Sequence, residues 1–145
     1  MKAKRVVLDT NVLISAALSA RSTPARITFW VLEHGRLLFS PETFAELETR
    51  LWRPKFDRYL NPETRRQLLH DFNAVAEWVT LPAQPGTAYC RDPDDDKFVH
   101  TALTGAADWL ISGDSDLLEL PAMDGLSILS PAQALALIDN DLPAG

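Results

Sequence analysis

The chain has 145 residues, of which 46% are hydrophobic and 23% are charged, and its formal net charge is −6. This length and composition fit one globular domain over residues 1–145 and exclude a disordered or fibrous chain, while the negative charge by itself argues against a nucleic-acid partner. No apolar run approaches the ~20 residues of a membrane span, and the single cysteine, Cys90, leaves no internal disulfide, so we expect a reduced, cytoplasmic protein with no membrane partner.

The first half of the chain alternates short strands with amphipathic helices. In chain order we expect a strand at residues 6–8, helices at 11–18 and 22–35, a strand at 37–39, and helices at 40–51 and 61–78. Three of these helices have a polar residue and a proline at their start, which is a common helix-start signal. These starts are Ser22-Thr23-Pro24, Ser40-Pro41 and Asn61-Pro62.

The second half continues the same alternation. We expect a strand at residues 79–81, a loop at 82–92, a helix at 92–105, a strand at 109–111, a helical turn at 115–120, a strand at 126–129 and a helix at 130–138. Strands that alternate with helices favour an α/β fold whose parallel sheet is covered on both faces. In such sheets ligands bind outside the carboxyl ends of the strands.

Two aspartates lie close after predicted strands. Asp9 follows the strand at residues 6–8, and Asp114 follows the strand at 109–111. Both are therefore expected at the ligand-binding edge of the sheet. Carboxylates gathered there repel one another unless some take up protons or a cation lies between them. For Asp9 the competing interpretation is an N-cap of the next helix.

Further acids lie on two predicted helices. Glu46 sits between Phe44 and Leu47, which favours a position at the core boundary, although a solvated helix acid is the competing interpretation. Four aspartates stand between residues 92 and 96, and most of them are expected to cap the helix or occupy its first turn. Asp96 is the candidate ligand among them because it precedes Phe98 and Val99 on the buried side.

Nearby polar residues could support these carboxylates. Asn11 and Asp116 each lie two residues after a candidate ligand, and Ser112 could donate a hydrogen bond to a carboxylate or a phosphate. The chain has neither a Gly-x-Ser-x-Gly elbow nor a phosphate-binding glycine loop. What remains is a site of hard carboxylate oxygens, which suits Mg²⁺ or Mn²⁺ and the metal-assisted hydrolysis of a phosphodiester.

The charge is polarised along the chain. Residues 50–66 hold six basic residues against two acids, whereas residues 92–96 hold four acids and no base. Basic side chains in such a cluster either contact the phosphates of RNA or form a solvated face. The candidates for RNA contacts are Arg50, Arg53, Lys55 and Arg58.

Four segments resemble, in order, the motifs of PIN-domain proteins. They are residues 7–16, 40–47, 92–108 and 110–118, and together they span most of the chain. The resemblance implies a three-layer α/β/α sandwich with a central, mostly parallel sheet of about five strands. It also implies an Mg²⁺- or Mn²⁺-dependent ribonuclease, often the VapC-like toxin of a type II toxin–antitoxin pair.

The resemblance also assigns roles to the acids. By position, the acidic quartet of catalytic residues is Asp9, Glu46, Asp96 and Asp114. Asp9, Asp96 and Asp114 would be the metal ligands, supported by Asn11, Ser112 and Asp116. The family commonly has asparagine at Asp96 or its neighbour, so the choice among residues 94–96 stays open.

The implied partners are RNA and a small antitoxin that occludes the site, with a homodimer as a further possibility. The helices around Trp30 and Trp52 could offer an apolar surface for such a partner, or pack their indoles in the core. Three other interpretations compete. They are a haloacid-dehalogenase-type phosphotransfer enzyme, a receiver domain, and a non-catalytic module that binds metal or a protein partner.

Overall fold

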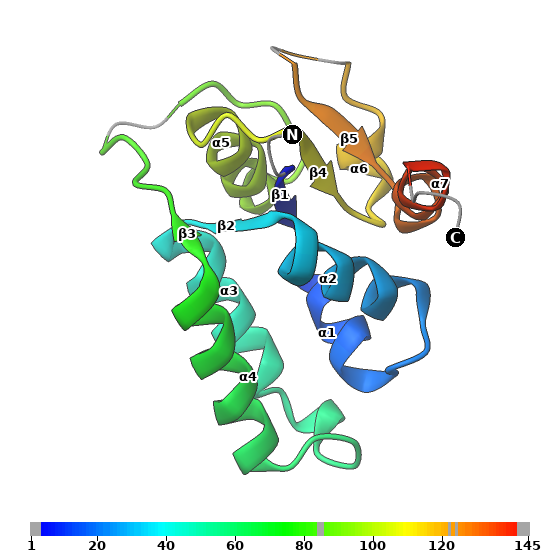
Figure 1. The fold of residues 1–145 in the computed structure, drawn as a ribbon. Coiled ribbons are helices and arrows are strands. Elements are labelled where there is room, and N and C mark those ends of the chain that lie inside the picture. Colours follow the sequence, from blue (N-terminus) through cyan, green and yellow to red (C-terminus); the bar gives the residue numbers. More distant parts are fainter. Residues whose placement is uncertain (1–3, 84–85, 122, 124, 142–145) are drawn as a thin grey trace.

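The computed structural model describes residues 4–83, 86–121, 123 and 125–141, and it centres on a parallel sheet (Figure 1). The strand order across the sheet is β3-β2-β1-β4-β5, and every neighbouring pair is parallel. The predicted five-stranded α/β architecture is therefore confirmed. The strands are β1 (Arg5–Leu8), β2 (Arg36–Phe39), β3 (Glu77–Trp78), β4 (Trp109–Ile111) and β5 (Ser127–Leu129).

The described residues also form seven α-helices, and several of these begin with the predicted caps. The Ser22 hydroxyl accepts from the backbone N–H of Ala25 at 3.2 Å, and the Asn61 side chain accepts from Thr64 at 2.7 Å. Each cap pairs an N–H that the helix itself leaves without a partner. The helices are α1 (Thr10–Leu18), α2 (Thr23–His34), α3 (Pro41–Leu51), α4 (Pro62–Val75), α5 (Asp96–Thr104), α6 (Ser115–Leu118) and α7 (Pro131–Asp141), with short 3-10 turns η1 (Pro54–Phe56) and η2 (Pro93–Asp95).

The three central strands, β1, β2 and β4, bury both of their faces. In β1, Val6 and Leu8 belong to a core shared with α1, α2, α3, α4 and α7. Val7, between them, belongs to a second core shared with α5 and α6. Successive strand side chains point to opposite faces, so both must be apolar when helices cover both sides. Figure 1 shows α1 and α2 on one side of the sheet and α5 on the other, which is the expected three-layer arrangement.

The boundary between α4 and β3 differs from the sequence-based prediction. We expected a helix to residue 78 and a strand at 79–81, but α4 ends at Val75 and β3 is Glu77–Trp78. Ala76 already has extended backbone angles, φ −65° and ψ 143°. The chain leaves the helix early because it pairs with the edge of β2, where the Val79 N–H donates to the Phe39 carbonyl at 2.7 Å. Within the described residues, no helix is long and apolar enough to cross a membrane.

Candidate functional site

The two central strands bring the first acids together. The Asp9 backbone N–H donates to the Ile111 carbonyl at 3.0 Å, which fixes the residue after β1 beside the end of β4. Asp9 is only 5% exposed and also stands at the N-cap of α1, 3.5 Å from the Asn11 N–H. The capping and site interpretations of Asp9 are therefore compatible, and the carboxylate lies at the expected edge of the sheet.

Ser112 links the carboxylates of the two strand ends. Its buried hydroxyl donates to Asp9 Oδ2 at 2.7 Å and accepts from the Asp114 backbone N–H at 2.9 Å. Burial raises the pKa of Asp9, and the hydrogen bonds from Ser112 and Asn11 offset only part of that rise. A buried carboxylate whose pKa is raised in this way is stabilised by any cation that binds beside it.

Asp95, Asp114 and Asp116 form a compact acidic cluster at the same edge. One carboxylate oxygen from each lies within 4.8 Å of the other two. Burial, followed by the charge of Asp114 and the smaller effects of Asp92 and Asp9, raises the pKa of Asp95 to about 7. Among the described residues, no lysine or arginine forms an ion pair with any member of this cluster. Three hard oxygen donors without a counter-charge fit a divalent cation.

Asp96 faces a different part of the molecule. Its Oδ1 accepts the backbone N–H of Tyr89 at 2.9 Å and of Cys90 at 2.7 Å. Burial alone would raise the pKa of Asp96, but the hydrogen bonds from Cys90 and Tyr89 outweigh it and lower the pKa. The Asp96 carboxylate therefore holds the loop before η2 through two backbone hydrogen bonds. Asp95, the preceding residue, is the one that lies beside Asp114.

Helix geometry explains why Asp95, and not Asp96, lies beside Asp114. Asp95 closes η2 and Asp96 opens α5, and successive helical residues point about 100° apart. The Asp92 side chain accepts from the Asp94 N–H at 3.0 Å and so caps η2, as expected of the first acids in this run.

Burial, followed by a hydrogen bond to Asp96, raises the pKa of the Cys90 thiol to about 12. The thiol therefore stays protonated at neutral pH.

Glu46 lies at the same edge but in a different electrostatic setting. Its Oε1 is 3.1 Å from Lys97 Nζ and 3.3 Å from an Arg50 guanidinium nitrogen, and its Oε2 accepts from the Thr10 hydroxyl at 2.6 Å. Arg50 also reaches Asn11 Oδ1 at 3.5 Å. Sequence reasoning missed Lys97 and Thr10. The spacing of Glu46 and Arg50 by four residues on one helix was the available signal for that pair.

The remaining basic residues lie beyond α3. Arg53, Lys55 and Arg58 are exposed around η1, and of the four predicted RNA contacts only Arg50 touches the acidic site. Trp52 packs against the buried Arg65, whose guanidinium lies 5.3 Å from the indole ring. Trp30 stacks on Trp109 with ring centroids 5.7 Å apart. Trp30 therefore packs against the core, whereas Trp52 remains 37% exposed.

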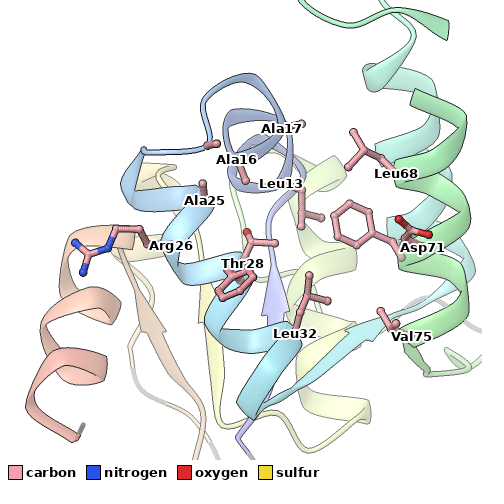
Figure 2. A pocket seen from close by; sticks show the side chains of 13 residues that line it. Leu13, Ala16, Ala17, Ala25, Arg26, Thr28, Leu32, Leu68, Asp71 and Val75 are labelled. Atoms are coloured by element: carbon pink, nitrogen blue, oxygen red, sulfur yellow. The ribbon is translucent and has the colours of Figure 1, made fainter. Parts of the chain in front are cut away.

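A separate groove of about 480 Å³ opens between α1, α2 and α4. Figure 2 shows Leu13, Leu32 and Leu68 pointing into it from these three helices. Phe29, which also lines it, is 62% exposed. The buried Thr28 hydroxyl in its wall has no hydrogen-bond partner among the described residues. An exposed apolar hollow of this kind is typical of a surface that another molecule covers.

Comparisons with known proteins agree with this fold. The family model of the PIN domain matches residues 5–116. The uncharacterised protein MJ1680 of Methanocaldococcus jannaschii is 34% identical over 118 residues, which cover 80% of this chain and 74% of that protein. Two solved structures share the fold.

One is VapBC2 from Rickettsia felis bound to a DNA fragment from its promoter, with a TM-score of 0.57 and 14% identity, covering 87% of this chain and 98% of that chain. The other is PAE2754 from Pyrobaculum aerophilum, with a TM-score of 0.60 and 15% identity, covering 96% of this chain and 91% of that chain. At these identities the likeness concerns the fold.

Proposed function

Since this chain belongs to the PIN-domain family, we propose that it is a divalent-metal-dependent ribonuclease and the toxin of a toxin–antitoxin pair. The observation that carries the proposal is the meeting of Asp9, Asp95, Asp114 and Asp116 at the carboxyl ends of β1 and β4. Family membership leaves the haloacid-dehalogenase and receiver interpretations without separate support.

We assign the metal to Asp9, Asp95 and Asp114, with Asp116 beside them, and we replace Asp96 by Asp95 in this set. Carboxylate oxygens favour Mg²⁺ or Mn²⁺. When bound, such an ion would polarise the phosphodiester and lower the pKa of the attacking water. Ser112 holds the Asp9 carboxylate in place from behind, as outer hydrogen bonds do at metal sites.

The other residues serve the substrate. In hydrolysis, the oxygen of water bonds to phosphorus, one ester P–O bond breaks, and the leaving oxygen takes up a proton. Arg50, Arg53, Lys55 and Arg58 are proposed to contact the RNA backbone along α3 and η1, where basic side chains neutralise phosphates. Glu46 holds Arg50 at the end of this basic surface nearest the acids.

The direct test uses a labelled single-stranded RNA with the purified protein. We expect cleavage with MnCl₂ or MgCl₂ and none when EDTA is added in excess, because the acids alone cannot stabilise the developing charge. Cleavage that persists in EDTA would reject the metal-dependent mechanism. Binding of Mn²⁺ without cleavage of any RNA would favour the non-catalytic binding module.

We further propose that a small antitoxin packs an apolar segment into the groove between α1, α2 and α4. The exposed Phe29 and the apolar lining support this assignment. Phe29→Asp is expected to abolish co-purification with the product of a short reading frame beside the gene, while RNA cleavage continues. Burying a new carboxylate against apolar side chains costs several kcal/mol.

The control is Leu137→Asp, which adds the same charge at an exposed leucine on α7. It should leave the complex intact. Retention of the complex by Phe29→Asp would refute the antitoxin at this groove. If instead Phe29→Asp changes the size of the isolated protein in solution, the groove is a homodimer surface.

A further inference from the structure

The candidate metal site has a positive half as well as a negative one. Lys97 Nζ and the Arg50 guanidinium, from α5 and α3, converge on the same oxygen of Glu46 at 3.1 and 3.3 Å. The aspartates of the site have no such partner, because none of the described lysines and arginines pairs with Asp9, Asp95 or Asp114. The paired cations therefore lie next to unpaired aspartates, and the charge of Arg50 also acts on Asp9.

Glu46 has more positive partners than a structural ion pair needs. Glu46 is a carboxylate whose side chain is 8% exposed, and one cation is enough to compensate it. Here it has two, and its second oxygen also accepts from Thr10. Two cations contact one carboxylate, so one positive charge remains either to offset the neighbouring aspartates or, once a metal has neutralised them, to attract an anion.

Both cations have more N–H donors than their described partners use. An ammonium has three N–H donors and a guanidinium has five. Within the described part of the chain, the side-chain partners of Lys97 and Arg50 are Glu46 and Asn11. The side chains of Lys97 and Arg50 are 24% and 28% exposed. Such half-buried, pre-oriented donors can bind a second oxygen anion with little further ordering.

We propose that Lys97 and Arg50 form a phosphate subsite, which binds the non-bridging oxygens of an RNA backbone phosphate beside the metal ligands. Glu46 positions both cations and is not itself a metal ligand. This inference rests on the proposed ribonuclease function and names a contact for it. Lys97 follows Asp95 by two residues on the chain, so the same helix start would hold the metal on one side and the phosphate on the other.

The test measures binding of a fluorescent, fully 2′-O-methylated oligoribonucleotide by anisotropy over a range of KCl concentrations with MnCl₂ present. Because attack by water does not require the 2′-hydroxyl, a gel checks that the oligonucleotide is intact after each titration. Lys97→Gln should raise Kd about tenfold at low salt and reduce the slope of log K against log salt by about 0.7, the value for one single-strand phosphate contact. Lys97→Arg should restore both, because the charge and donors remain.

The charge-matched control is Lys4→Gln. Lys4 lies before β1, at the opposite edge of the sheet, where its ammonium group packs against Trp109. It should leave affinity and slope unchanged. The inference is overturned if Lys97→Gln has the same affinity and salt dependence as Lys4→Gln. It is also overturned if Lys97→Gln loses Mn²⁺ binding together with RNA binding, because support of the metal ligands would then explain the loss of RNA binding. Wild-type protein that binds the oligonucleotide but cleaves no RNA would refute the ribonuclease and leave the subsite standing.

Discussion

Asp95→Asn is expected to reduce RNA cleavage by on the order of 10³-fold, since losing a metal ligand removes several kcal/mol of transition-state stabilisation at about 1.4 kcal/mol per tenfold. The variant keeps the shape of the side chain but weakens its affinity for a hard cation. Its fold should be intact, because Asp95 makes no side-chain cap to its own helix. Single-turnover cleavage with MnCl₂, together with Mn²⁺ titration, measures the loss.

Asp96→Asn is the matched control, one residue along the chain. An asparagine oxygen can still accept the N–H groups of Tyr89 and Cys90, so most of the activity should remain. Asp96→Ala, in contrast, leaves two part-buried donors without a partner and should cost about 2–4 kcal/mol of unfolding free energy. If Asp96→Asn is inactive and Asp95→Asn is active, the original assignment of Asp96 as the ligand is right.

The metal-free protein is expected to lose stability as the pH rises from about 4 to about 7. Asp95 has a folded-state pKa of about 7 against an ordinary value of 3.8. A carboxyl group with a raised folded pKa contributes stability that is complete below its unfolded pKa and is lost as the pH rises through its folded pKa. The raised pKa of Asp9 acts in the same direction.

Because Asp95 is partly solvated, we discount the effect to about 1–2 kcal/mol, or a fall in Tm of roughly 3–8 °C. Thermal unfolding in EDTA across this pH range measures it. MnCl₂ should reverse the trend, since a bound cation favours the ionised carboxylates. Asp95→Asn removes the titrating group and should flatten the curve. A wild-type protein whose stability changes with pH just as the variant's does would contradict the assignment.

The sheet was predictable because its strands are short, apolar and bounded by clear helix starts. Asp9 and Asp114 could be placed for the same reason, since a residue just after a parallel strand lies at a known edge. The end of α4 was not predictable, because residues 75–79 satisfy a helical stripe and a strand equally well. Pairing with β2, which is remote in sequence, decides between them.

The choice between Asp95 and Asp96 required the three-dimensional structure. The four aspartates between residues 92 and 96 point in different directions around the helix axis. The path of the backbone from η2 into α5 decides which of them faces Asp114. The backbone N–H groups of Tyr89 and Cys90 donate hydrogen bonds to Asp96. Because these are backbone donors, no pattern of side chains in the sequence predicts them. Lys97 was missed for a similar reason: its partner Glu46 lies on another helix, and only the fold brings them together.

The hydrogen bond between Ser112 and Asp9 joins residues that are 103 positions apart. A contact of this sequence separation forms late in folding, because a long loop must close first. During synthesis the chain therefore carries Asp9 and Glu46 well before Asp95, Asp114 and Asp116 exist. The candidate metal site therefore assembles only when β4 pairs with β1, after the last of its acids has been synthesised.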